Sequence, residues 1–368
     1  MVKSFFLDQE SRLKAFTGIV LAVVRKYGSG KQNDVDADET FLYQTHLESK
    51  YSIDGRWTTI RGKFKRLVAD YVAIGAPATL KSRGSKGSAE GKIPKVSNKY
   101  SMDEQQFKDL ESMIRNNDDE TEIIREITDD AKNAILNIYR LNEYTFLHGL
   151  QNGVAAVGKD VSKGVEIRAD YGYEDDQKLN VATAGKIEIE DVQKLIDGAR
   201  KKPSVLFIDA VSLGRIRNSL SFRAAVANGA NVVLEDATKY PVLNISQVEN
   251  YFAQEWKIKL VQDVDKTFEV QNNETGESDI VKPWTDGVMV FASSNVVGKL
   301  FNSKTVEHGR RSKTADYAEA DYILISKFGE LDPLVEFTKA EAEVLPVINA
   351  DGIYVLNTNS TTEDLPTG

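Results

Sequence analysis

An abrupt change of charge near residue 100 constrains this chain more than any other feature of its sequence. Residues 56–100 carry eleven Lys or Arg and two acids, which gives a local charge of +9. Residues 101–130 carry eleven acids and three bases, which gives −8. The stretch 75–98, GAPATLKSRGSKGSAEGKIPKVSN, is rich in Gly and Ser and has few apolar side chains. Because it cannot offset its ordering entropy by burying a core, we expect it to stay disordered or to bind another molecule.

The acidic block predicts two helices. The first covers residues 102–115, with Ser101 as its N-cap. The second runs from about residue 118 to 148, and Gly149 and Gly153 end it. About thirty residues at 1.5 Å each make a rod of roughly 45 Å. The apolar residues of the second helix recur at steps of three and four: Ile124, Ile127, Ala131, Ala134, Ile138 and Leu141.

Shorter patterns predict the remaining elements. Residues 9–27 fit an amphipathic helix that packs on a core, and their longest apolar run, GIVLAVV, is too short to span a bilayer. Asp54-Gly55, between two β-prone runs, is typical of a hairpin turn. SVLFIDA predicts a buried strand, and SQVENYFAQEW predicts a helix capped by Ser246. Residues 322–358 predict consecutive strands.

The overall composition is that of a globular protein with enough residues for about two domains. The 368 residues carry a net charge of −9, so the chain as a whole is not built to grip nucleic acid. The basic and aromatic run at residues 56–66 can be read as a nucleic-acid patch, but its acidic surroundings favour an acidic protein surface as partner. The sequence contains no Cys, which excludes disulfides and thiolate metal sites.

No motif in the sequence predicts catalysis, a metal site or a cofactor. The three histidines, His46, His148 and His308, lie far apart in the sequence and have no metal-ligand spacing, so we interpret each as structural. The sequence YGSGKQ around Lys31 lacks the full phosphate-loop pattern, and there is no G-x-S-x-G elbow. We therefore assign no catalytic residue, no metal ligand and no cofactor, and we predict that the protein is not an enzyme.

Four stretches carry a resemblance to a known family. LVADYVAIGAPATLKSRG (67–84) is similar to its strand entering an extended loop, and DYGYEDDQKLNVATAG (170–185) to the stretch before its apical domain. KPSVLFIDAVSLGRIRNSLSFR (202–223) and LDPLVEFTKAEAEVLPVINADGIYVLNT (331–358) are similar to an apical strand-then-helix segment and to the closing segment. In this order they resemble the major capsid proteins of tailed bacteriophages, of the Hong Kong 97-type fold, and within them the branch of the lambda major head protein.

The resemblance implies an α+β, Hong Kong 97-like capsid fold in five parts. These parts are an N-terminal arm (1–54), an extended β-hairpin loop (55–100), the first part of a peripheral domain with a long spine helix (101–189), an apical domain (190–320), and the second part of the peripheral domain with the C-terminal tail (321–368).

The resemblance also implies a structural, non-catalytic function. Copies of such a head protein self-assemble into pentamers and hexamers, which form an icosahedral shell around double-stranded DNA. The implied partners are further copies of the chain, a separate scaffold protein, a portal, in some heads a decoration protein, and DNA held non-specifically at the inner wall. The implied location is the virion, after assembly in the bacterial host cytoplasm, and no membrane is expected.

The change of charge gains a role from this resemblance. The extended loop of such a protein lies across a neighbouring subunit, so we expect its bases to contact the acidic helical region of another copy. The loop residues are Lys81, Arg83, Lys86, Lys92 and Lys95, and the acidic residues are Asp118, Asp119 and Glu120.

Two other interpretations stay open. An encapsulin-like nanocompartment shell shares the fold but encloses an enzyme instead of a genome. A soluble α/β enzyme with a basic substrate loop belongs to a different class of protein, and the lack of any site motif argues against it.

Overall fold

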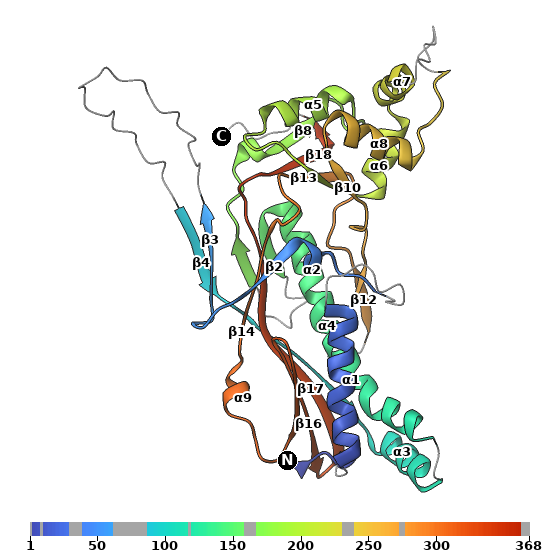
Figure 1. Cartoon of the computed structure of the whole chain (residues 1–368), viewed down its shortest axis with the longest axis vertical. Coiled ribbons are helices and arrows are strands. Elements are labelled where there is room, and N and C mark those ends of the chain that lie inside the picture. The colour runs from blue at the N-terminus through green and yellow to red at the C-terminus, as the bar shows by residue number, and fades with distance from the viewer. Residues whose placement is uncertain are drawn as a thin grey trace, which may run out of the picture.

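The computed structural model is an elongated molecule, with one sheet near the top of the view and a longer sheet below it (Figure 1). The structure describes residues 2–7, 10–28, 39–61, 87–116, 119–157, 167–229, 239–271 and 277–361.

Helices and strands alternate irregularly along these residues. The α-helices are α1 (Glu10–Gly28), α2 (Leu42–His46), α3 (Glu104–Asn116), α4 (Glu120–Asn152), α5 (Ile189–Gly198), α6 (Ala210–Asn218), α7 (Leu220–Gly229), α8 (Ile245–Glu255) and α9 (Val306–Gly309). The strands before α5 are β1 (Val2–Lys3), β2 (Leu47–Tyr51), β3 (Arg56–Arg61), β4 (Gly87–Lys92), β5 (Lys95–Met102), β6 (Val154–Val157), β7 (Ile167–Asp170) and β8 (Lys178–Val181). The later strands are β9 (Val205–Ile208), β10 (Lys259–Val261), β11 (Phe268–Gln271), β12 (Ser278–Val281), β13 (Val288–Ala292), β14 (Gly298–Ser303), β15 (Asp316–Ala320), β16 (Ile323–Leu331), β17 (Leu334–Ile348) and β18 (Ile353–Thr361).

The lower sheet is organised around the 15-residue strand β17. In the described part of the chain this sheet has seven strands in the order β1-β16-β17-β14-β2, with β15 on β16 and β5 on β17. The first half of β17 lies between β16 and β5, and its second half pairs with β14. Strands β16 and β17, together with β18 of the upper sheet, confirm the consecutive strands predicted for residues 322–358.

Helix α4 packs along β17, and α1 packs on α4 (Figure 1). The predicted long helix is therefore confirmed, and its 33 residues measure about 50 Å at 1.5 Å each. Its buried side chains recur at helical spacing, with two differences from the prediction: Ile123 is buried where Ile124 was expected, and Leu141 is only half-buried. The predicted stop at Gly149 is wrong, because the helix continues to Asn152. Glycine at position 149 instead makes room for Tyr171, since a Cβ there would lie 2.9 Å from its ring. Gly153 follows the last turn with φ of +75°, which favours glycine.

The upper sheet has its own hydrophobic core. Its strands run in the order β10-β9-β13-β18-β8, and α5, α6 and α8 supply the residues that cover it. Strand β9 is buried at all four positions, as the SVLFIDA pattern predicts. Leu206 on β9 is fully buried in the same cluster as Phe252 of α8 and Phe291 of β13. Asp209 follows the strand and caps α6, because its side chain accepts hydrogen bonds from the backbone N–H groups of Val211 and Ser212.

The predicted hairpin around Asp54-Gly55 is wrong, although a turn is present. Gly55 has φ of +65°, but the strands on either side do not pair with each other. Instead β2 pairs in parallel with β14, and β3 pairs antiparallel with β4. An Asp-Gly signal specifies a local reversal of the chain, whereas long-range pairing decides where each strand goes.

Two predicted helix caps are also wrong by two residues. Ser101 belongs to β5, and Asp103 caps α3 by accepting a hydrogen bond from the backbone N–H of Gln106 at 2.9 Å. Asn244, not Ser246, caps α8 by accepting from the backbone N–H of Gln247 at 2.8 Å. Both cap residues form a capping box with a Gln three positions later, a pattern that the sequence contains.

The division of the chain into five parts stays a prediction. The structure places β14 and β15, which lie within residues 298–320, in the lower sheet. It places β18, near the C-terminal end of the described residues, in the upper sheet. The chain therefore passes between the two sheets several times.

The buried strand β9 predicts a large effect of truncation. Leu206→Ala should lower the free energy of unfolding by about 2–5 kcal/mol, because it removes a fully buried side chain and leaves a cavity. The measurement is denaturant unfolding of the purified subunit. Ile280→Ala is the matched control, since that side chain is 74% exposed and its loss should change stability by less than about 0.5 kcal/mol. Equal effects of the two substitutions would contradict the burial of β9.

Candidate functional site

The antiparallel hairpin β3–β4 projects from the body of the molecule (Figure 1). Its base is fixed, because Trp57 is buried and stands against Gly91, where a Cβ would lie 2.7 Å from the indole nitrogen. The backbone N–H of Ile93 donates to the carbonyl of Gly55 at 2.8 Å and closes the base. The described part of the hairpin is thus anchored on its own subunit at this base. The predicted contact residues Lys81, Arg83 and Lys86 lie outside the described residues.

The two predicted lysines near this base have different surroundings. Lys92, at the end of β4, is exposed to solvent. Lys95, at the start of β5, is half exposed, and its Nζ lies 2.6 Å from Oε2 of Glu341. Glu341 belongs to β17 of the same chain and is fully buried. The structure therefore gives Lys95 a partner within its own subunit.

Glu341 is the centre of a buried charged cluster. It also accepts hydrogen bonds from Lys339 at 3.1 Å and from the hydroxyl of Thr305. Burial by itself would raise the pKa of Glu341, but the bonds from Lys95, Thr305 and Lys339 lower it to about 2. Lys339 in turn pairs with Glu307 of α9. The cluster therefore links the base of the hairpin to β17 and to the segment around α9.

The predicted acidic residues lie at the other side of the molecule. Asp119 is exposed at the start of α4, where its carbonyl accepts from the backbone N–H of Glu122 at 2.9 Å. Glu120 begins the helix, and Asp118 lies outside the described residues. In Figure 1 this end of α4 lies low in the view beside α3, while the hairpin projects from the opposite side. Figure 1 thus places the described part of the hairpin and the start of α4 apart within one subunit.

Each histidine has a local partner. His46 Nδ1 lies 2.7 Å from the carbonyl of Asn295, and His148 Nδ1 lies 3.2 Å from that of Val154. His308 Nδ1 lies 3.0 Å from the hydroxyl of Thr305. Burial lowers the pKa of all three side chains, so they are neutral at pH 7. This agrees with the structural interpretation of the histidines.

The sequence analysis missed Glu341 and its partners. One signal was present, since TKAEAEV alternates and places Lys339, Glu341 and Glu343 on one face of a strand. The alternation does not tell which of these charges is buried or which distant lysine pairs with it. Charge counts along the chain identified the basic hairpin but not its fixed end.

The comparisons with known proteins give matches of structure only. No protein-family model and no curated protein matches the sequence. A solved structure described as a prophage capsid protein of E. coli CFT073 matches with a TM-score of 0.53 and 13% identity, over 93% of this chain and 98% of that one. The capsid asymmetric unit of cyanophage A-1(L) matches with a TM-score of 0.52 and 10% identity, over 90% and 96%. A phage-related protein of Bordetella bronchiseptica RB50 matches with a TM-score of 0.50 and 10% identity, over 95% and 98%.

The Glu341 cluster predicts a pH-dependent contribution to stability. Glu341→Gln should lower the free energy of unfolding at pH 7 by about 1–3 kcal/mol, because Lys95 and Lys339 lose the charge they face. The pKa of Glu341 is about 2, below its ordinary 4.5, so its contribution is complete above pH 4.5 and is lost as the pH falls toward 2.

Denaturant unfolding of both proteins at several pH values is the measurement. The difference between wild type and Glu341→Gln should stay constant at neutral pH and shrink below about pH 4.5. Glu343→Gln, on the same face of β17, is the control and should change stability by less than about 0.5 kcal/mol. A difference that grows on acidification would contradict the assignment.

Proposed function

We propose that this chain, which folds as phage capsid proteins do, is the major capsid subunit of a tailed bacteriophage. Many copies would form pentamers and hexamers, and these would close into an icosahedral shell around double-stranded DNA. The capsid fold carries this proposal, because the likeness to the E. coli prophage structure extends over 93% of the chain. The proposed role is structural, and we assign no catalytic residue.

The isolation of hairpin β3–β4 is an observation in favour of assembly between copies. In the described residues it forms a separate two-stranded sheet, joined to neither larger sheet. An isolated two-stranded hairpin is marginally stable in water, so it needs cover from another surface. Since the rest of its own subunit lies at its base, a second copy is the natural source of that cover (Figure 1).

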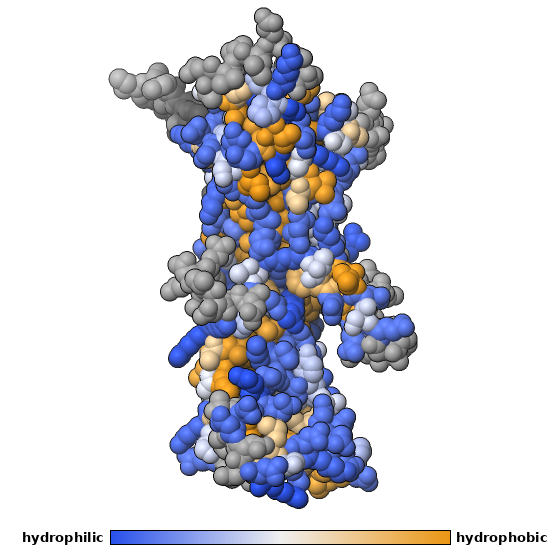
Figure 2. Space-filling view, turned by 90° about the vertical axis from the view of Figure 1, so that its right-hand side faces the viewer, coloured by the Kyte–Doolittle hydropathy of each residue, from blue (hydrophilic) through white to orange (hydrophobic). Residues whose placement is uncertain are grey.

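Exposed apolar side chains support further contacts between subunits. Figure 2 shows a mostly hydrophilic face with apolar residues gathered toward its upper end. Four of the exposed large apolar residues belong to the apical helices α6 to α8 or their connections: Val211, Leu220, Val242 and Ile245. Exposed apolar side chains on these helices are candidates for contact with other molecules.

We further propose that the two charge blocks pair between subunits. Lys81, Arg83, Lys86, Lys92 and Lys95 of one copy would face Asp118, Asp119 and Glu120 of another. The described part of the hairpin and the start of α4 lie on opposite sides of one subunit, which favours pairing with a second copy (Figure 1). Lys95 would have a double role, since it also holds Glu341 of its own chain.

The remaining partners follow from the capsid role. A separate scaffold protein would guide assembly, a portal would occupy one vertex, and a decoration protein could bind the outside of the shell. DNA would lie against the inner wall without sequence-specific contacts, which the net charge of −9 favours. Assembly would take place in the host cytoplasm and the product would be the virion. No helix in the described ranges has the length and apolar character needed to cross a bilayer.

Electron microscopy of the expressed protein tests the capsid role. Size-exclusion chromatography should give capsomers or megadalton particles, and negative-stain images of material made with its phage partners should show portals or tails. Small empty shells without them would favour a nanocompartment. A small oligomer with no particles under any assembly condition would favour a soluble enzyme and would overturn the proposal.

Reversal of loop charges tests the pairing. Lys81→Glu, Arg83→Glu and Lys86→Glu together should impair assembly at low salt while leaving subunit folding unchanged. Each exposed ion pair contributes only about 0.2–1 kcal/mol, but the contact recurs at every subunit boundary. The effect should weaken above about 0.15 M salt, where screening acts over roughly 8 Å. Particle yield across a salt series, read by light scattering, is the measurement.

The control and the rescue use equal charge changes. Lys178→Glu, Lys186→Glu and Lys194→Glu, at exposed positions near the upper sheet, should impair assembly less. Reversing Asp118, Asp119 and Glu120 to Lys in the loop variant should restore part of the yield. Normal assembly of the loop variant at low salt would mean that the two charge blocks do not meet.

A further inference from the structure

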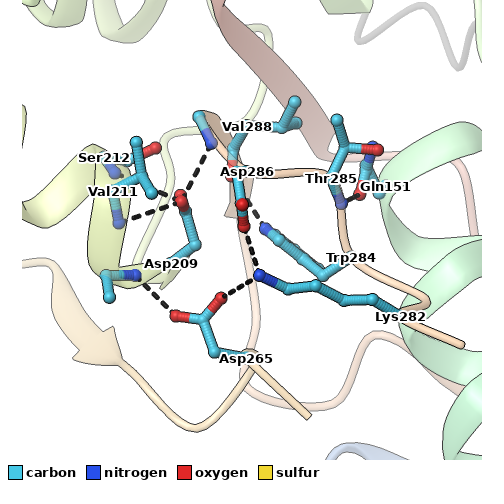
Figure 3. Close-up of polar contacts among 12 residues, drawn as sticks. Gln151, Asp209, Val211, Ser212, Asp265, Lys282, Trp284, Thr285, Asp286 and Val288 are labelled. Atoms are coloured by element: carbon cyan, nitrogen blue, oxygen red, sulfur yellow. Dashed lines mark hydrogen bonds and ion pairs between the residues drawn. The ribbon is translucent and has the colours of Figure 1, made fainter. Parts of the chain in front are cut away.

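Three carboxylates from separate parts of the chain meet beside the upper sheet. Asp209 follows β9, Asp265 follows β10, and Asp286 precedes β13. One oxygen of each lies within 4.8 Å of the other two. Figure 3 shows the three side chains pointing toward a common space between their loops. No sequence motif marks this cluster, because the three residues come from distant stretches.

Asp209 has an unsatisfied oxygen in this cluster. The residue is fully buried. Its Oδ2 accepts three backbone N–H groups, from Val211 at 3.1 Å, Ser212 at 3.2 Å and Gly287 at 2.9 Å. Its Oδ1 has no hydrogen-bond partner in the described part of the chain. A buried carboxylate oxygen without a donor is costly, so a ligand at Oδ1 would stabilise the fold.

Lys282 neutralises only part of the cluster. Its Nζ lies 3.3 Å from Oδ1 of Asp265 and pairs with Oδ1 of Asp286 (Figure 3). One ammonium against three carboxylates leaves a net charge of −2. The contacts of Lys282 are with the two outer acids, so they leave Oδ1 of Asp209 unsatisfied. The lysine side chain is 36% exposed and can turn into solvent.

We propose that Asp209, Asp265 and Asp286 form a calcium site in which Ca²⁺ replaces the ammonium of Lys282. Ca²⁺ binds oxygen ligands at about 2.3–2.6 Å, so two of its ligands can lie up to about 5 Å apart, whereas Mg²⁺ at about 2.0–2.1 Å needs a tighter set. Oxygens within 4.8 Å of one another are within the span of the larger ion. Since Asp265 and Asp286 are partly exposed, water can complete the coordination.

The bound ion would join three loops that also contact the rest of the molecule. The backbone N–H of Thr285 donates to the side chain of Gln151 at the end of α4, at 2.7 Å (Figure 3). The side chain of Asn359 on β18 donates to the carbonyl of Asp286 at 2.7 Å. An ion at Asp286 would therefore stiffen the junction between the upper sheet and the spine helix. This inference does not depend on the proposed shell, because it concerns the single subunit.

Calcium titration of the full-length subunit tests the site. After treatment with a chelator, added CaCl₂ should raise the melting temperature and give a saturable heat of binding in calorimetry. Asp286→Asn and Asp265→Asn should each remove the response. Asp279→Asn, an exposed acid on β12, is the control and should leave it intact. MgCl₂, and NaCl at equal ionic strength, should give smaller shifts.

Lys282→Met separates the proposal from an ordinary ion-pair network. If Ca²⁺ competes with the lysine, this variant should be less stable without calcium, should bind Ca²⁺ several-fold more tightly than wild type, and should regain stability when Ca²⁺ is added. If Ca²⁺ fails to restore Lys282→Met, the three acids serve the lysine alone and the proposal is wrong. Equal Ca²⁺ binding by Asp286→Asn would place the ion elsewhere and would also overturn it.

Discussion

The packing of helix α4 on strand β17 is the constraint on which the rest of the structure depends. The helix places a stripe of small and branched side chains, such as Ala131 and Ala134, against the sheet, which allows a close approach over several turns. Lys327 of β16 secures the contact, because its buried Nζ donates to the carbonyl of Ile127 at 3.1 Å and pairs with Glu336 at 3.3 Å. A buried charge pair of this kind persists only with further hydrogen bonds, and both partners have them.

Other segments are attached to this helix and sheet through buried carboxylates. Glu336 accepts from the hydroxyl of Ser4 at 2.7 Å and so holds the N-terminal strand. Glu143 of α4 accepts from the backbone N–H of Leu42 at 2.9 Å and from Lys266 at 2.9 Å. Burial raises the pKa of Glu143, while Lys266 acts in the opposite direction and favours the charged form. One side chain thus joins the start of α2, helix α4 and the loop that leaves the upper sheet.

Local patterns in the sequence predicted the parts of the fold that depend on local physics. Helix α4, helix α1 and strand β9 follow from the periodicity of apolar residues, and the α+β capsid fold expected from the resemblance is confirmed by the structural matches. The predictions that were wrong concern the pairing of strands and the N-caps of helices. Strand β2 pairs with β14, about 250 residues away in the sequence, and no local turn signal can specify so distant a partner. The narrower placement beside the lambda major head protein stays a prediction.

The candidate sites divide in the same way. A charge count located the basic hairpin, because excess charge is a property of a continuous stretch. Glu341 and Asp209 gain their properties from residues that are distant in sequence, so only the fold shows that they are buried and which residues contact them.

The fixed base of the hairpin also affects the proposed assembly. A hairpin fixed at its base by Trp57 and Lys95 has already lost part of its conformational entropy before it meets a neighbour. If the proposed pairing holds, weak ion pairs would then contribute to binding instead of to ordering, and because each pair contributes little, a misplaced copy would be able to dissociate before assembly is complete.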